Sequence, residues 1–356
     1  MAASDGGIAA LHFPHAAPPE PGTLAEVAPG VHWLRMPLPF ALDHINLWLL
    51  EDGAGWTIVD SGLATPTTQE LWERIFAHSL GGKPVTRLIV THFHPDHMGL
   101  AGWLTRHWQI PLWVSETEWL WARMMSADRD DAAFAAEQTP FYRRTGLDET
   151  TVQMLAGRGN QYAKRVGPVP REFHRIADGV AIAIGGRRWQ VIVGRGHAPE
   201  HACLYCPELD LLIAGDQVLP KISPNVSVWP TEPDADPLAH YLQSLEVLRR
   251  AVPADVLVLP SHNLPFHGLD TRIDQLASHH AERLVEIEAA CAKPHSTMEI
   301  VPLLFRRQLD AQQLAFAIGE ALAHIHYLVA AGRLTRRARA DGVFVFSSSP
   351  LPPGEG

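Results

Sequence analysis

Residues 91–99, Thr-His-Phe-His-Pro-Asp-His-Met-Gly, hold three histidines and one aspartate within six positions. His92 and His94 are two residues apart behind an apolar run, so in an extended chain their imidazoles face the same side and can hold one metal ion. The chain then turns at a proline, and Asp96 and His97 fall at the start of a helical stretch, where they can face a second ion. Imidazole and carboxylate ligands without thiolate suit zinc, and also manganese or iron.

Four further apolar runs of the sequence end on a histidine or an aspartate, namely those that precede Asp60, His197, Asp216 and His262. Because α/β sheets bind their ligands at the carboxyl ends of strands, we expect these side chains to converge. His197 follows a Gly-Arg-Gly turn, which lets the backbone bend around an ion. Asp216 could bridge two ions with its two oxygens, and Asp60 could fix a ligand or a water by hydrogen bonds.

The elements that position these residues alternate between short apolar runs and amphipathic stretches from about residue 31 to residue 262. This alternation predicts an α/β fold in which β-sheets are covered by helices. Residues 116–165 differ, because they are helical in composition and rich in tryptophan, methionine and phenylalanine. They could form a wall or lid over the site or be an ordinary helical insertion, and the sequence favours neither.

The end of the chain has a third character. From about residue 272, three helical stretches are followed by the short apolar run Gly-Val-Phe-Val-Phe, which suggests a winged-helix-like module. The expected organisation is a flexible tail (1–24), a catalytic domain (25–270) with the insertion at 116–165, the C-terminal module (271–347) and a second tail (348–356).

Composition limits the functional classes. The 356 residues are 46% hydrophobic and 19% charged, as in globular proteins, and no run of about 18 apolar residues predicts a membrane span. The first residues lack a basic start followed by an apolar stretch, and three cysteines give no disulfide framework, so we expect a cytoplasmic protein. A net charge of -10 argues weakly against a broad nucleic-acid surface. We expect one local basic cluster, a solvated helix end formed by Arg333, Arg336, Arg337 and Arg339.

The metal-ligand pattern resembles that of the metallo-β-lactamase superfamily. The family hallmark H-x-H-x-D-H stands at residues 92–97, and the other family motifs match Asp60, His197, Asp216 and His262 in order over about residues 25–270. The resemblance implies an αββα sandwich with two metal ions at the sheet edge. The resemblance also implies which ligands hold each ion. The first ion would be held by His92, His94 and His197, the second by Asp96, His97 and His262, and both by Asp216.

The same resemblance implies a hydrolase. With an aspartate at position 216, the chain resembles the hydrolase branch of the family, which includes glyoxalase II, the lactonases and the ribonuclease Z relatives. The zinc β-lactamases have a cysteine at this position. Water between two metal ions would lose a proton near neutral pH and attack an electrophilic centre, with Asp96 or Asp216 orienting the water or moving its proton. A net positive site would favour an anionic small-molecule substrate.

Two functions remain open from the sequence. The first is hydrolysis of a small thioester, ester or lactone at a two-zinc site. The second is an endoribonuclease or phosphodiesterase, because the C-terminal segment resembles the winged-helix appendage of the β-lactamase-like protein 2 branch, some of whose members cut single-stranded RNA. Candidate substrate-binding residues, chosen for their nearness in sequence to the insertion or the ligands, are Arg158, Tyr162, Lys221 and Asn225.

Overall fold

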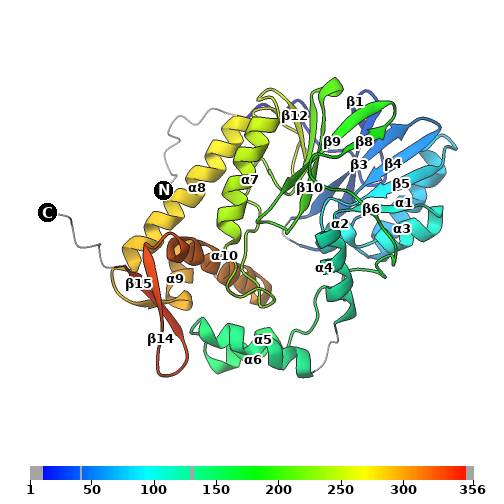
Figure 1. The fold of residues 1–356 in the computed structure, drawn as a ribbon. Helices are drawn as coiled ribbons and strands as arrows, with labels where there is room; N and C mark the ends of the chain where they lie inside the picture. Colours follow the sequence, from blue (N-terminus) through cyan, green and yellow to red (C-terminus); the bar gives the residue numbers. More distant parts are fainter. Residues whose placement is uncertain (1–10, 41, 129–131, 350–356) are drawn as a thin grey trace.

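The computed structural model describes residues 11–40, 42–128 and 132–349. Two β-sheets pack face to face, and helices cover both outer faces (Figure 1). The predicted fold class is therefore confirmed, both for the sandwich and for the helical C-terminal region. Within the described ranges, no helix combines the length and the apolar character that a membrane span requires.

The first sheet has seven strands in the order of the chain: β1 (Ala25–Ala28), β2 (Val31–Pro37), β3 (His44–Asp52), β4 (Gly55–Val59), β5 (Val85–Ile89), β6 (Leu112–Val114) and β7 (His174–Arg175). Neighbours from β1 to β4 are antiparallel, and those from β4 to β7 are parallel. Alternate side chains of β3 enter two different cores. Trp48 and Leu50 lie between the sheets, whereas Leu47 and Leu49 lie under the outer helices.

The second sheet has five strands in the order β12-β11-β10-β9-β8. Only the β11–β12 pair among them is parallel. Their bounds are β8 (Ala181–Ile184), β9 (Arg187–Gly194), β10 (His201–Cys206), β11 (Leu211–Gly215) and β12 (Leu257–Pro260), with a short 3-10 helix (Pro207–Leu209) between β10 and β11. Trp33, Trp48 and Trp189 are fully buried between the two sheets and fix their separation.

Helices α1 (Pro66–His78), α2 (Pro95–Met98), α3 (Ala101–Trp108) and α4 (Glu116–Ala127) belong to the outer face of the first sheet. The sequence at the start of helix α1 is typical of a helix N-terminus. The side chain of Thr65 accepts a hydrogen bond from the Thr68 N–H, and Pro66 occupies the first helical position. Asp96 and His97 lie in α2, a separate short helix, and not at the start of the longer helix α3.

The outer face of the second sheet and the C-terminal region share one apolar core. Its helices are α5 (Ala132–Arg144), α6 (Glu149–Ala156), α7 (Pro237–Ala251), α8 (Leu269–Ala290), α9 (Thr297–Leu304) and α10 (Ala311–Ala330). A small sheet in the order β13-β15-β14 completes it, with β13 (His295–Ser296), β14 (Leu334–Ala338) and β15 (Phe344–Ser348). The helices of the C-terminal region therefore pack on the same core as α7.

Two expectations from the sequence were wrong. Residues 11–24 were expected to belong to a flexible tail, but Leu11 and Phe13 pack against the shared core and residue 12 pairs with His267; residues 1–10 and 350–356 lie outside the described residues. Arg336 and Arg337 were expected at a helix end, but they lie in strand β14. Three arginines of that cluster form ion pairs: Arg333 with Glu288, Arg336 with Asp234 and Arg339 with Asp341.

Candidate metal centre

Four loops at one edge of the sandwich bring together the seven side chains that the sequence singled out as ligands, and a fifth loop brings Asp60 beside them. Their donor atoms form three overlapping groups, within each of which all donor atoms lie within 4.8 Å of one another. The groups are His92, His94 and His197; His92, His97 and Asp216; and Asp96, His97 and His262. The strands that end at this edge are β4, β5, β9, β11 and β12, because each is followed within three residues by Asp60, His92, His197, Asp216 or His262.

The first ligand group consists of His92, His94 and His197. His92 Nε2 lies 3.0 Å from His94 Nδ1 and 3.2 Å from His197 Nε2. His197 Nδ1 faces the carbonyl oxygen of Asn225 at 2.8 Å, so this nitrogen must carry the proton that it donates. The Nε2 lone pair of His197 is therefore directed at the other two imidazoles.

The second ligand group consists of Asp96, His97 and His262. His97 Nδ1 donates to Asp60 Oδ2 at 2.8 Å, and His262 Nδ1 donates to the carbonyl oxygen of residue 44 at 2.8 Å. Both rings therefore turn an Nε2 lone pair inward, and His262 Nε2 lies 3.5 Å from Asp96 Oδ2. A carboxylate or carbonyl behind each ring is the arrangement that orients metal-binding histidines.

Asp216 lies between the two groups. Its Oδ2 is 3.4 Å from His197 Nε2, and its Oδ1 is 3.6 Å from His97 Nε2 and 3.5 Å from His262 Nε2. The Asp216 N–H donates to Nε2 of the buried His201 at 3.1 Å, which fixes the backbone that carries the carboxylate. One carboxylate thus offers an oxygen to each group.

The donor set fits divalent cations. His97 Nε2 and Asp216 Oδ1 are buried and lack a hydrogen-bond partner among the described residues. Lone pairs that converge without protons between them repel one another, and a cation removes that repulsion. Nitrogen ligands around a tetrahedral zinc at about 2.0–2.1 Å lie about 3.4 Å apart, which is close to the 3.0 and 3.2 Å spacings of the first ligand group.

Burial and neighbouring charges hold three ligands, His92, His94 and Asp216, in the forms that bind metal. Burial and the adjacent imidazoles hold the pKa of His92 and of His94 well below the ordinary value, so both are neutral at pH 7. Burial opposes ionisation of Asp216, but His262 and His97 outweigh it and hold its pKa well below the usual range. Burial would also lower the pKa of His97, yet nearby carboxylates, Asp60 first, raise it well above its ordinary value. They favour the protonated form of His97 instead, so a cation bound there would displace that proton.

Comparisons with known proteins agree with this geometry. The model of the metallo-β-lactamase superfamily matches residues 41–262, and that of the metallo-β-lactamase-like C-terminal domain matches residues 284–349. The chain belongs to the metallo-β-lactamase superfamily.

Individual relatives of the chain point to hydrolysis. A β-lactamase domain protein from Burkholderia ambifaria has a crystal structure that is 46% identical with a TM-score of 0.88, over 95% of this chain and 98% of that chain. The probable metallo-hydrolase YqjP of Bacillus subtilis is 23% identical over 87% of this chain and 96% of its own length. A linear primary-alkylsulfatase of a Pseudomonas species is 24% identical over 62% of this chain and 42% of its own length. The chain thus has relatives named as hydrolases.

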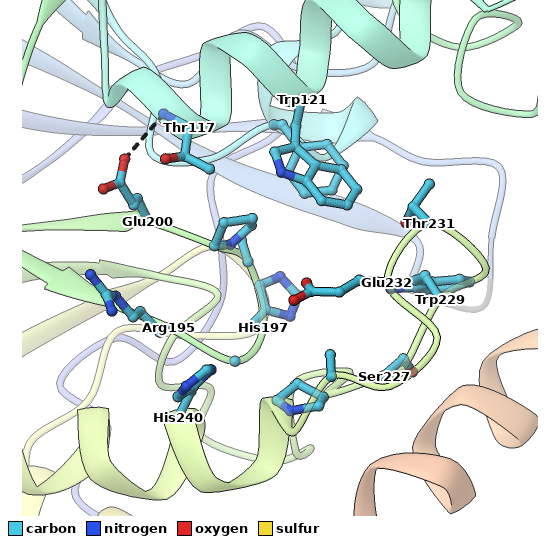
Figure 2. A pocket seen from close by; sticks show the side chains of 16 residues that line it. Thr117, Trp121, Arg195, His197, Glu200, Ser227, Trp229, Thr231, Glu232 and His240 are labelled. Atoms are coloured by element: carbon cyan, nitrogen blue, oxygen red, sulfur yellow. Dashed lines mark hydrogen bonds between the residues drawn. The ribbon is translucent and has the colours of Figure 1, made fainter. Parts of the chain in front are cut away.

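A cavity of about 290 Å³ opens beside the candidate centre of this superfamily member. Figure 2 shows Trp121 entering it from α4 and Trp229 from the loop before α7, with the Glu232 carboxylate beside His197. Phe93 lines it as well. The cavity therefore has aromatic walls next to the first ligand group, and α4, the first helix of the 116–165 block, forms one of them. Helices α5 and α6 of that block pack on the C-terminal core instead.

The four candidate substrate residues do not line this cavity. The Tyr162 side chain is buried and its hydroxyl donates to the Phe93 carbonyl at 2.6 Å, so it supports the ligand loop. Arg158 donates to the carbonyl of residue 311 on the C-terminal helix α10. Lys221 is exposed, and Asn225 contributes its backbone carbonyl to His197. Substrate contact by these four residues stays a prediction from the sequence.

Sequence reasoning missed several residues that support the centre. The Thr91 hydroxyl donates to Asp60 and lies 3.1 Å from His92 Nδ1. Thr91 stands next to the first histidine, so its position could have suggested this role. Glu118 accepts hydrogen bonds from the Phe93 and Glu200 N–H groups, and Trp229 lines the cavity. Neither residue carries a comparable local pattern, because their partners are distant in the chain.

Proposed function

We propose that the chain is a hydrolase with two divalent cations, zinc in the first instance, and that it cleaves a small thioester, ester or lactone with an apolar acyl arm. The convergence of two ligand groups on the single carboxylate of Asp216 carries the two-ion proposal. His92, His94 and His197 would hold one ion, Asp96, His97 and His262 the other, and Asp216 would contact both. When bound, such cations supply Lewis acidity toward a substrate oxygen and lower the pKa of water.

The residues of the chain have separable tasks in this proposal. Asp216 is buried and held by His201, so it suits a fixed ligand. The Asp96 side chain keeps 19% exposure at the mouth of the centre, where it can accept a proton from incoming water and pass it to the leaving group. Asp60 and two backbone carbonyls hold three of the imidazoles, those of His97, His197 and His262, in the tautomer that leaves Nε2 free.

The aromatic cavity supports the acyl arm. Trp121, Trp229 and Phe93 form an apolar surface directly beside His197, and burying apolar atoms there would contribute roughly 25 cal/mol per Å². A relative named as a linear primary-alkylsulfatase supports an apolar substrate chain, although the chain matches only 42% of its length. The ion pairs of Arg333, Arg336 and Arg339 leave less free basic surface for RNA, so the endoribonuclease stays the second candidate.

A substrate panel on zinc-analysed protein tests this function. We expect about two zinc ions per chain and turnover of acyl thioesters and aryl esters that rises with acyl length, without cleavage of single-stranded RNA. Trp229→Ala should raise KM for a long acyl chain about tenfold, the effect of roughly 1.4 kcal/mol of lost burial, and change KM for an acetyl ester little. Trp119→Ala is the matched control, because Trp119 stacks on Phe173 and is absent from the cavity lining.

Either of two results would contradict the proposal. Turnover of RNA alone would favour the phosphodiesterase. If Trp229→Ala and the wild type had equal KM values along the whole acyl series, the acyl arm would not bind in this cavity.

A further inference from the structure

Glu118 is a fully buried carboxylate in the first turn of α4 that lies outside the seven candidate ligands. Its Oε2 accepts a hydrogen bond from the Phe93 N–H at 2.8 Å, and its Oε1 accepts one from the Glu200 N–H at 2.6 Å. Phe93 stands between the two histidines of the first ligand loop, and Glu200 follows the third histidine, His197, by three residues. One side chain therefore ties together the two loops that carry the first ligand group.

Further hydrogen bonds fix the same two loops. The Glu200 carboxylate accepts from the Thr117 N–H at 3.1 Å, the bond drawn in Figure 2. The Ser115 hydroxyl donates to the Glu200 carbonyl at 2.9 Å, and the buried Tyr162 hydroxyl donates to the Phe93 carbonyl at 2.6 Å. Both peptide groups of Phe93 are thus held by side chains from the segment 116–165, which is remote in sequence from both loops.

The chemistry of Glu118 is unusual for a residue that only fills space. Its hydrogen-bonding partners are neutral N–H groups, and burial raises the pKa of this carboxyl to about 7 although those N–H groups act in the opposite direction. Burying a carboxyl group in this way is costly. Two acceptor oxygens are needed, however, because the N–H groups come from two separate loops, and a glutamine would offer only one.

We propose that Glu118 is a positioning residue for the metal centre, which sets the spacing of the imidazoles of His92, His94 and His197 by locking their two loops against each other. The inference rests on the proposed metal centre. A group bonded directly to a metal-ligating side chain typically changes metal affinity about 10–100-fold when it is replaced. Glu118 acts one step further out, through the backbone of the ligand loops, so we expect the lower end of that range. The first ligand group should therefore bind zinc less tightly when this link is broken, even if the chain stays folded.

Chelator competition on the full chain tests the proposal, with zinc affinity measured beside the unfolding temperature of the metal-free protein. Glu118→Gln keeps the shape but sets an NH₂ group against a backbone N–H, and we expect the affinity for one of two zinc ions to fall at least about tenfold. Tyr162→Phe, which leaves the carboxylate in place, should weaken the same ion several-fold. Glu299→Gln is the matched control, because Glu299 accepts from the Ser296 N–H and hydroxyl at the start of α9.

The outcomes separate the two proposals. Zinc affinity that falls in Glu118→Gln and Tyr162→Phe but stays unchanged in Glu299→Gln supports the positioning role. Wild-type zinc affinity in Glu118→Gln, with a lower unfolding temperature, would overturn it and leave Glu118 structural. If Glu118→Gln fails to fold, wild-type affinity in Tyr162→Phe would overturn it in the same way. A wild-type chain that binds no zinc would overturn the metal centre itself, and the positioning role with it.

Discussion

The carboxylate of Asp60 should control the second of the two proposed zinc ions through His97. Asp60 is buried, and its Oδ2 accepts from His97 Nδ1 at 2.8 Å while its Oδ1 accepts from the Thr91 N–H at 2.8 Å. In Asp60→Asn the oxygen can keep the bond to Thr91, but the amide NH₂ then faces His97 Nδ1. A neutral His97 can only accept that bond by moving its proton to Nε2, which removes the lone pair that points at the centre.

The expected magnitude follows from this tautomer change. Replacing a carboxylate behind a metal-binding histidine typically weakens metal affinity about 10–100-fold, which corresponds to about 1.4–2.8 kcal/mol. The backbone should tolerate the substitution, because Asp60 has a φ of +64° and asparagine is one of the residues that adopt this left-handed conformation. The loss should therefore appear in metal affinity and not as a failure to fold.

Chelator competition with two-zinc protein measures this effect. We expect Asp60→Asn to lose one zinc ion at a chelator concentration that leaves the other bound. Asp52→Asn is the matched control, because Asp52 ends β3 opposite Gly55, at the far end of β4 from Asp60, and accepts from Arg87 at 2.7 Å and from the Gly185 N–H at 3.0 Å. It should lower stability without changing zinc affinity. Two equally tight zinc ions in Asp60→Asn, or the same zinc loss in both variants, would refute the reasoning.

Three further predictions concern other parts of the molecule. Asp216→Ala should lose most of its zinc, measured by metal analysis, together with its activity, measured by kinetics. Full zinc content and full activity would show that this residue is not part of the centre. Gly319→Ala should raise KM for acyl substrates at unchanged zinc content, because its Cβ would lie 2.7 Å from Ser227 Cβ and overpacking costs about 1–3 kcal/mol; Ser227→Gly in the same chain should restore part of KM, and an unchanged KM would contradict the contact. Burial lowers the pKa of His280 to about 3 and of His324 to about 4. Below about pH 6.5 the unfolded chain therefore binds more protons than the folded chain, and the free energy of unfolding decreases as the pH is lowered. His324→Gln should therefore lose about 1–2 kcal/mol less than the wild type between about pH 7 and 5 in urea unfolding with chelator, and identical slopes would refute this.

The superfamily and the location of the centre could be predicted because the relevant pattern is local. In the segment around His92 and His97, a strand end followed by a short helix places four donors within six residues. The remaining candidate ligands each stand at the end of an apolar run, and apolar runs are the part of a sequence that most directly indicates strands. The exact helix bounds were less accessible, because α2 and α3 are separated only by residues 99–100.

What the sequence did not reveal depends on contacts between distant segments. Tyr162 was a candidate substrate residue because it lies near the end of the aromatic-rich block 116–165, yet its hydroxyl meets the carbonyl of Phe93, 69 residues earlier. Glu118 meets Glu200 across 82 residues. Very short strands also escaped, because β7 has two residues and gives no measurable alternation.

The C-terminal region bears on the chemistry through the wall of the cavity. In helix α10, the Gly319 carbonyl accepts a hydrogen bond from the Val228 N–H at 3.0 Å. The ring of Phe316, in the same helix, packs edge to face on Trp229 with 5.6 Å between the ring centroids. Because α10 packs on α7, α8 and α9 within one apolar core, moving it would move Trp229 with it. The appended helices therefore support one aromatic wall while Glu118 and α4 support the other. Substrate preference in such an arrangement depends on the relation between α4 and α10, whereas metal binding depends on the strand ends and on the loops that Glu118 ties together.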